Sequence, residues 1–480
     1  MQYNRVLLVR LAYIGYLANV DIFPVGLGYI AESLKKVGID YKNLDLGLTS
    51  ANKEKQLLIE GIKQYSPDLI GISMMTLGHR EHYQLIDDIK QQFPNIHIVI
   101  GGPHISTFRV KVLEECKGID YGIVLEGEDT IIELCQGKPL SEIKGLSYIS
   151  NGNVVYTGDR EFIKNLDAIQ YPLYEENNLN NYPPEIPIVT SRGCPYNCTY
   201  CPVSLAIGRK FRVRSAVNVI EEMNYWYKKG YRKFSMWDDN FTLIDKRVYE
   251  ICDLIEATGL EDISIDIPNG VRADKVDRKM LARMKEVGFK QLSFGVESAS
   301  NKVLKNLKKG ETAEDNERAI ADACDLGFEV YLYFIIGSPG ETWQDFEKSL
   351  ALAKKYPVAE ARFYTLIPFP GTELFKWCKD KNYLIRIPDD YLNKIPHFIP
   401  DPCFVTPEMS REERIKAFLV GWKITLKQRR DFRARQLKHL WPFNKIIAAV
   451  TLSDVYHGIF KPTWVRKWIT RPIRKMIFRT

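Results

Sequence analysis

The stretch "TSRGCPYNCTYCPV", residues 190–203, holds three cysteines within eight positions. Cys194, Cys198 and Cys201 follow the spacing Cys-x₃-Cys-x₂-Cys, with Gly193 before the first of them. Thiolates are soft ligands that suit zinc or iron–sulfur clusters. A short loop with three thiolates and no adjacent fourth ligand favours an iron–sulfur cube with three protein-bound irons and one open iron. An open iron makes chemical sense only where another molecule is to bind.

A zinc site and a disulfide are the alternatives for these cysteines. Structural zinc needs four ligands, and no histidine occurs between His104 and His397, so the fourth ligand would have to be remote. Six further cysteines stand singly in predicted helices and loops: Cys116, Cys135, Cys252, Cys324, Cys378 and Cys403. Scattered single cysteines are typical of a reduced compartment, where disulfides rarely persist. We therefore expect a cytoplasmic protein.

The composition allows two or three domains and divides the charge unevenly. The chain has 480 residues, of which 45% are hydrophobic, and a net charge of +7. Residues 423–480 hold fifteen Lys and Arg against Asp431 and Asp454, a net charge of +13, which leaves −6 for the rest. The start, "MQYNRVLLVRLAYIGYL", reads as a short buried strand and a loop rather than a secretory leader. No run of eighteen apolar residues predicts a membrane-spanning helix.

Strands and helices alternate on the carboxyl side of the cysteine motif. Six strand candidates lie between residues 186 and 372: "IPIVTSR", "RKFSMWDDNFT", "DISIDIPNGVRAD", "KQLSFGVESAS", "EVYLYFIIGSPGET" and "EARFYTLIPFPGT". Helical patterns such as "SAVNVIEEMNYWYKKG" separate them, and each candidate ends in polar residues or glycine. Such an order predicts a partial (β/α)₆ barrel with its chemistry at the carboxyl ends of the strands.

Strands and helices also alternate in residues 5–136. The apolar runs are "RVLLVR", "YKNLDL", "LIGIS", "HIVIGG" and "YGIVLEG". This pattern predicts a parallel, doubly wound Rossmann-like sheet that binds a ligand at the carboxyl ends of its strands. No G-x-G-x-x-G follows the first strand, so a dinucleotide is not expected. The glycines at the strand ends would admit a flat ligand, and tight turns are the alternative explanation for them.

The motif and the barrel together resemble the radical S-adenosylmethionine (SAM) family. The cysteine spacing, the aromatic Tyr200, "WDDNFT", "GVES" and "IIGSPGE" carry this resemblance. It implies a 4Fe–4S cluster on the three cysteines, which are the implied catalytic and metal-binding residues. SAM would bind the open iron and be cleaved to a 5′-deoxyadenosyl radical. The implied SAM contacts are Tyr200, Asp238, Asp239, Arg272, Glu297, Ser298, Ile336 and Gly337. A salt bridge to a barrel carboxylate is the alternative for Arg272.

The N-terminal third resembles the cobalamin-binding domain that precedes the barrel in one branch of this family. "FPVGLGYIAESLKKVG", "PDLIGIS", "VIGGPH" and "VLEGEDT" match in order and spacing. The implied cobalamin contacts are Ser73, Thr76, Gly101, Gly102, His104, Glu126, Gly127, Glu128 and Thr130. The D-x-H-x-x-G signature of a cobalt-binding histidine is absent, so histidine is not expected on the lower face of the cofactor. His79 and His82, at the start of a predicted helix, are expected at the surface.

These patterns divide the chain into four parts. A cobalamin-binding domain is expected over residues 1–140, a linker over 141–185, the radical SAM barrel over 186–375 and a mainly helical basic region over 376–480. The linker contains "LDAIQYP", residues 166–172, which matches a connector often found before this barrel. The resemblance covers residues 1 to about 375, where "PFPGTEL" closes the barrel.

The C-terminal region combines basic and aromatic residues. Ser410 and Glu413 form a predicted capping box at the start of a helix. Farther on, one helical face gathers Trp464, Val465, Trp468 and Ile469, with Arg466, Lys467 and Arg471 off that face. Basic amphipathic helices of this kind lie on anionic membranes, which gives the expectation of peripheral membrane contact. Packing on the barrel is the next alternative, and nucleic acid ranks last.

The expected activity is that of a cobalamin-dependent radical SAM C-methyltransferase. The resemblance implies that the SAM-derived radical abstracts hydrogen from an unactivated carbon, which then receives a methyl group from methylcobalamin. The substrate is expected to be a small or lipid-like molecule, and a flavodoxin- or ferredoxin-type protein is expected to donate electrons. The alternatives are a radical SAM cyclase or rearrangement enzyme, an RNA-modifying methylthiotransferase-like enzyme, and a non-enzymatic electron-transfer or cofactor-carrier protein.

Overall fold

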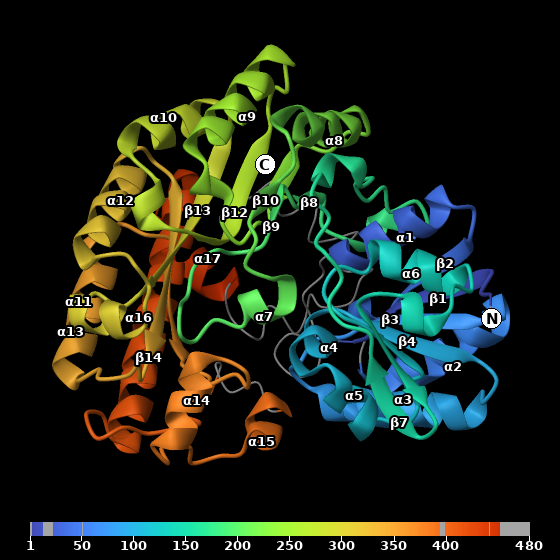
Figure 1. Ribbon diagram of the computed structural model, residues 1–480. Coiled ribbons are helices and arrows are strands. Elements are labelled where there is room, and N and C mark those ends of the chain that lie inside the picture. Colours follow the sequence, from blue (N-terminus) through green and yellow to red (C-terminus); the bar gives the residue numbers. More distant parts are fainter. Residues whose placement is uncertain (1, 13–22, 50, 394–398, 441, 452–480) are drawn as a thin grey trace.

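The structure is a computed structural model that describes residues 2–12, 23–49, 51–393, 399–440 and 442–451. Two α/β units lie side by side, and α7 (Val203–Ile207) and the chain around it lie between them (Figure 1). The predicted face of Trp464, Val465, Trp468 and Ile469 falls outside the described residues. Within the described ranges, no helix is both long enough and apolar enough to cross a membrane.

The N-terminal unit is a seven-stranded sheet in the order β2-β1-β3-β4-β5-β6-β7. Its strands are β1 (Arg5–Arg10), β2 (Asp40–Asp45), β3 (Leu69–Ser73), β4 (His97–Gly101), β5 (Tyr121–Ile123), β6 (Leu146–Ser150) and β7 (Asn153–Tyr156). Its helices are α1 (Val25–Lys36), α2 (Ala51–Tyr65), α3 (His79–Gln92), α4 (Pro103–Phe108), α5 (Val110–Glu115) and α6 (Glu128–Cys135). The first five strands are parallel, as expected, and β6 and β7 are antiparallel.

Separate apolar cores cover the two faces of this sheet. Leu27 and Leu34 of α1 and Leu134 of α6 pack on one face. Ile62 of α2 and Ile86 of α3 belong to the core on the other face. Helices on both faces confirm the doubly wound prediction. The sheet, however, continues past residue 140, because the β6–β7 hairpin pairs with β5 inside the predicted linker.

The second unit is a six-stranded parallel sheet in the order β15-β14-β13-β12-β11-β8, the predicted half-barrel. Its strands are β8 (Glu185–Ile188), β11 (Lys233–Met236), β12 (Ser264–Val271), β13 (Phe289–Glu297), β14 (Glu329–Ile336) and β15 (Glu360–Thr365). A small antiparallel pair, β9 (Ser191–Arg192) and β10 (Arg212–Val213), flanks the cysteine loop. Its helices are α8 (Ala216–Lys228), α9 (Asp245–Ala257), α10 (Arg278–Glu286), α11 (Asn301–Asn306), α12 (Ala313–Asp325) and α13 (Trp343–Lys355).

The described C-terminal region is helical, as expected. It comprises α14 (Glu373–Asp380), α15 (Pro388–Asn393), α16 (Arg411–Gln436) and α17 (Asn444–Thr451). The capping box at the start of α16 is confirmed, with Ser410 and Glu413 each bonding the other's backbone. Helix α16 packs along β15, where the Thr425 hydroxyl donates to the Ala361 carbonyl at 2.6 Å. Helix α15 reaches the N-terminal unit, because Asp389 pairs with Arg80 at 2.6 Å.

Candidate functional site

The three motif cysteines lie on a loop that neighbouring elements hold by their backbone. Thr199 donates its N–H to the Leu307 carbonyl at 3.0 Å and accepts from Leu374 at 2.8 Å. Gly193 has φ +90°, and a side chain there would collide with the Lys210 carbonyl. Asn240 donates to the Cys194 sulfur at 3.0 Å. The sequence motif is therefore a loop held on both sides, with its sulfurs half-buried and outside any disulfide.

The protonation of the cysteine thiols bears on metal binding at this loop. Among the described residues, no three Cys, His, Asp or Glu side chains are grouped closely enough to hold a single metal ion. Burial raises the pKa of the Cys198 thiol, and it raises that of Cys201 to about 12. Metal binding at this loop would therefore release protons at neutral pH.

The two adjacent aspartates after β11 have different surroundings. Asp238 is 1% exposed and accepts from the backbone N–H groups of Thr190 and Ser191 at 2.6 and 2.9 Å, and from the Thr190 hydroxyl. Its carboxylate thus fixes the turn that leads into the cysteine loop. Asp239 lines the main cavity, which lies between the two units. Burial raises the pKa of Asp239 to about 6, and the negative charge of Asp238 adds to this shift. Of the two predicted SAM contacts, Asp239 is the one that faces open space.

A buried chain of charged groups begins at Tyr200, inside the cysteine motif. Its hydroxyl donates to Glu297 Oε1 at 2.9 Å, and Lys309 Nζ donates to the same oxygen at 3.0 Å. Glu297 has φ +59°, a costly backbone conformation for a residue with a side chain. Lys309 is 8% exposed, and its ammonium also lies 3.7 Å from Glu311. Strain and buried charge at the end of β13 are typical of a functional site.

Arg272 joins this network through ion pairs. A salt bridge of this kind is the alternative to a SAM contact that the sequence analysis gives for this residue. Its Nε lies 2.9 Å from Asp274 and 3.6 Å from Glu311, and its guanidinium lies over Tyr196. Arg272 Nη2 and Glu311 Oε2 are nevertheless buried without a hydrogen-bond partner. Burial raises the pKa of Glu311 to about 7. Buried polar atoms that lack a protein partner leave room for a hydrogen bond to water, an ion or a ligand.

The remaining predicted SAM contacts are engaged in the protein. Ser298 is fully buried, and its hydroxyl accepts from the Ser300 backbone at 3.2 Å. Ile336 belongs to the barrel core. Gly337 donates its N–H to Glu341 at 2.6 Å, while its carbonyl accepts from Arg414 at 2.8 Å. Ile336 and Gly337 lie at the end of β14 and Ser298 follows β13, and none of the three lines the main cavity.

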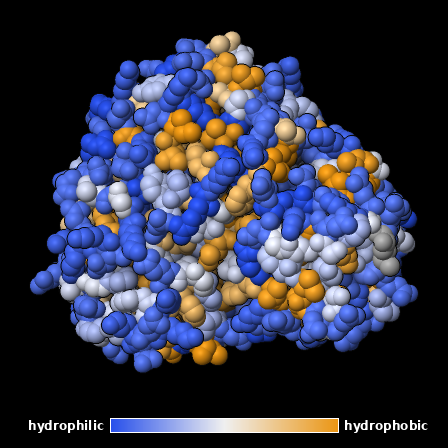
Figure 2. Space-filling model, viewed as in Figure 1, coloured by the Kyte–Doolittle hydropathy of each residue, from blue (hydrophilic) through white to orange (hydrophobic). Residues whose placement is uncertain are grey.

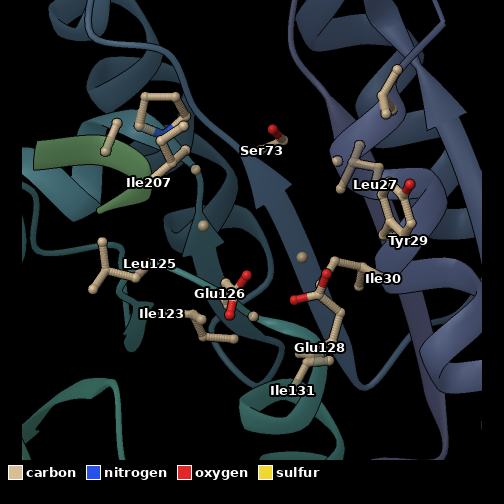
Figure 3. Close-up of a pocket in the computed structure, with 18 of the residues that line it drawn as sticks. Leu27, Tyr29, Ile30, Ser73, Ile123, Leu125, Glu126, Glu128, Ile131 and Ile207 are labelled. Atoms are coloured by element: carbon tan, nitrogen blue, oxygen red, sulfur yellow. The ribbon is translucent and has the colours of Figure 1, made fainter. Parts of the chain in front are cut away.

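The main cavity, of about 540 Å³, lies between the two units. The N-terminal unit contributes the carboxyl ends of its strands and α1, and the barrel unit contributes Ser191, Arg192, Trp237 and Asp239. Figure 3 shows Leu27 and Ile30 of α1 on one side and Ile207 of α7 on the other. Figure 2 shows apolar residues at the surface between the units. The wall is thus largely aliphatic, as suits a large flat ligand or an apolar one.

The structure separates the nine predicted cobalamin contacts into two groups. Six of them line the cavity: Ser73, Gly101, Gly102, Glu126, Gly127 and Glu128. Thr76, His104 and Thr130 do not. Thr130 bonds the Lys144 carbonyl at 3.0 Å, and the His104 ring nitrogen pairs with the Tyr83 hydroxyl at 2.6 Å. A Cβ on Gly101 would meet nothing within 4 Å, so this strand end leaves free room for a ligand.

The expectation that His79 and His82 lie at the surface is wrong. Both are 5% exposed, and they bond the backbone carbonyls of Thr76 and Ala12 at 3.0 and 3.1 Å. Burial lowers the pKa of His82 to about 4, so its imidazole is neutral at pH 7. The apolar residues of α3 pack in the core against the sheet. The two histidines lie on the same side of this helix, so they are buried as well.

Charged pairs that the sequence did not predict connect the two units beside the cavity. Arg192, just before the cysteine loop, contacts Glu126 at 3.1 Å and Glu128 at 2.7 Å, and Arg212 contacts Glu126 at 2.7 Å. Burial alone would raise the pKa of Glu128, but the Arg192 guanidinium outweighs it and lowers that pKa. The carboxylates of Glu126 and Glu128 point toward the cavity (Figure 3). They therefore hold the domains together as well as lining the ligand space.

Comparisons with known proteins agree with this architecture. The B12-binding domain model matches residues 14–135, and the radical SAM superfamily model matches residues 188–353. An uncharacterized methyltransferase of Pyrococcus horikoshii is 34% identical over 373 residues, covering 76% of this chain and 80% of the relative. An anaerobic magnesium-protoporphyrin IX monomethyl ester cyclase of Cereibacter sphaeroides is 27% identical, covering 75% of this chain and 60% of that one.

A solved structure shares the fold over most of both chains. The radical SAM methyltransferase TsrM from Kitasatospora setae, with cobalamin and a [4Fe-4S] cluster bound, superposes with a TM-score of 0.71. Its sequence is 18% identical, and the match covers 88% of this chain and 91% of that chain. This chain belongs to the radical SAM enzymes that carry a B12-binding domain, and its cofactors are a 4Fe–4S cluster, SAM and cobalamin.

Proposed function

We propose that this enzyme transfers a methyl group to an unactivated carbon of a small, largely apolar molecule. One observation carries this proposal: a single cavity is lined both by strand ends of the B12-binding domain and by Trp237 and Asp239 of the barrel. Two cofactor-binding units that share one space can act on the same substrate atom. The aliphatic lining supports an apolar or lipid-like substrate.

Each cofactor has residues that fit it. Cys194, Cys198 and Cys201 would hold the cluster, and Ser73, Gly101 and Gly127 would admit the corrin. Once bound, the cluster supplies an electron that cleaves SAM, and cobalamin supplies the methyl group. The protein positions these groups, excludes water with its aliphatic wall, and fixes the cysteine loop through Asp238 and Thr199.

The SAM contacts proposed from the geometry differ from those expected from the sequence alone. Asp239 is the carboxylate available to the SAM amine, because Asp238 is occupied by backbone donors. Glu297, Lys309 and Arg272 form the charged wall, in which Arg272 Nη2 remains available to a carboxylate. Lys309 and Glu311 were missed by sequence reasoning, although "KKGET", residues 308–312, follows the fourth barrel strand closely.

Replacing Lys309 by methionine is expected to weaken SAM binding by about 10- to 100-fold, because Glu297 would keep a buried charge without its cation. Equilibrium dialysis of SAM against cluster-loaded protein measures the effect. Lys308→Met is the matched control, since Lys308 is exposed and pairs with Glu373 at the surface. Equal losses in both variants would contradict the proposed role, and Lys309→Arg is expected to restore part of the affinity.

The product balance tests the proposed reaction. For each methyl group transferred, one SAM molecule yields methionine and 5′-deoxyadenosine and a second yields S-adenosylhomocysteine. Anaerobic turnover with dithionite and a mixture of apolar candidate substrates is expected to give both nucleosides in similar amounts, measured by chromatography. 5′-Deoxyadenosine alone would reject methyl transfer. That result would favour ring formation, the activity for which the matched Cereibacter relative is named.

The physiological electron donor is proposed to be a flavodoxin- or ferredoxin-type protein. The enzyme is proposed to work in the cytoplasm, at least in part at the inner face of a membrane. Nucleic acid is not proposed as a partner, because the described lining of the cavity is mostly aliphatic, with Tyr29 and Trp237 as its aromatic side chains.

A further inference from the structure

Helix α16 carries apolar residues on its barrel-facing side and on the neighbouring solvent-facing side, and the stacked rings of Phe418 and Trp422 lie where the two sides meet. On one side Ala417, Phe418 and Gly421 pack on the barrel, where a Cβ on Gly421 would touch the Phe363 ring. This side explains why α16 lies along β15 beside β14 (Figure 1). A helix that only covers a barrel needs a single apolar stripe. The second apolar side therefore requires its own explanation.

The second side is exposed to solvent in the described structure. Leu419, Trp422 and Leu426 are 48%, 40% and 40% exposed. Their spacing of three and four residues puts them on one face of the helix. Exposed cations lie along one edge of this face: Lys416, Lys423, Lys427 and Arg430. The acidic residues Glu412 and Glu413 lie in the first turn, at the far end, and Asp431 is paired with Lys427 at 2.7 Å.

Helix α17 carries exposed apolar residues of its own. Its packing side is fixed by Asn444, which donates to the Ala434 carbonyl at 3.0 Å, and by Ala448 in a small shared core. Phe443, just before this helix, and Ile446 are left 61% and 64% exposed. The sequence continues directly into residues 452–480, which hold seven Lys and Arg against Asp454. The positive charge thus continues beyond the described helices.

We propose that the exposed face of α16, Leu419–Trp422–Leu426 with the cations along its edge, docks this enzyme on an anionic membrane surface. Aliphatic side chains and tryptophan insert at the boundary between headgroups and acyl chains, while Lys and Arg stay at the level of the phosphates. Charge complementarity favours anionic lipid over neutral lipid. Nucleic acid would use the cations but gain nothing from exposed leucines. This inference does not depend on the proposed reaction.

Vesicle binding by the full-length protein tests this inference. Sedimentation with phosphatidylglycerol vesicles is expected to exceed that with phosphatidylcholine vesicles by at least about tenfold, and to fall as salt rises. The double variant Leu419→Glu/Trp422→Glu is expected to lose at least about tenfold in binding to the anionic vesicles. Val217→Glu on α8 is the matched control, because Val217 is 57% exposed on another helix. SAM cleavage in vesicle-free buffer is expected to stay unchanged in all three proteins.

Several outcomes would overturn the proposal. Equal binding by the wild type and the double variant would show that this face does not contact lipid. No vesicle binding by the wild type would show that this face does not dock on a membrane. A dimer in light scattering that the double variant abolishes would identify a second copy as the occupant. Equal affinity for neutral and anionic vesicles would remove the role given to the lysines.

Discussion

Cys198→Ala is expected to abolish SAM cleavage, with a fall of at least about 10³-fold in 5′-deoxyadenosine formation, because the ligands of one cluster act as a unit. Cys198 is the middle cysteine of a loop that Thr199 holds by its backbone to Leu307 and Leu374. Reconstituted wild-type protein is expected to hold about four irons per chain. The variant is expected to hold fewer and to lose the broad iron–sulfur absorbance.

The control for this variant is Cys324→Ala. Cys324 is half-buried on α12, away from the loop, and its replacement removes only a small side chain from a partly buried position. Its activity and iron content are expected to stay within about twofold of the wild type. If the Cys198→Ala protein kept its iron and cleaved SAM normally, the hypothesis that this loop binds the cluster would be rejected.

The sequence predicted the elements of both units well. All six barrel strands and the five parallel strands of the first sheet are present, because runs of buried residues between turn residues define strands locally. The capping box at Ser410 is equally local. The β6–β7 hairpin was missed because its polar residues, such as Ser147 and Asn153, resemble a linker. Only pairing with β5 shows that it belongs to the sheet.

The directions of side chains at the strand ends were harder to predict. A strand alternates its sides regularly, but that alternation stops where the strand becomes a loop. Asp238 therefore turns to the backbone of Thr190 while Asp239 turns to the cavity, and the sequence could not distinguish them. His104 follows Gly102, whose φ of +99° redirects the chain, so its side chain enters the domain core.

Contacts between the units lay beyond sequence reasoning. Arg192 and Glu128 are far apart in the chain and meet only when the two units dock. Their burial ties domain docking to the shape of the cavity, because Glu128 and Arg192 both belong to its wall. A shift of one unit against the other would leave either charge buried and unpaired, and the free-energy cost of this opposes such a shift. The ion pair that joins the two units is therefore also part of the cavity wall, a relation that no single-domain motif contains.

Gly101→Leu is expected to weaken cobalamin binding by about 5- to 150-fold while leaving SAM cleavage intact. Gly101 ends β4 and lines the cavity, and its missing side chain would point into open space. A leucine can be accommodated there without strain in the free protein, but it occupies room that the corrin needs. Overpacking of such a space costs about 1–3 kcal/mol, which corresponds to that range of affinity.

Three measurements separate this effect from misfolding. The unfolding temperature of Gly101→Leu without cobalamin is expected to match that of the wild type, because no neighbouring atom lies within 4 Å of the new Cβ. Cobalamin bound per chain, from the corrin absorbance after gel filtration, is expected to fall in Gly101→Leu and to persist in Gly101→Ala, which adds one methyl group. Turnover is then expected to yield 5′-deoxyadenosine without S-adenosylhomocysteine. Normal corrin content in the leucine variant would show that cobalamin binds elsewhere. The methyl donor would then also lie elsewhere, and the two units would not share one substrate space.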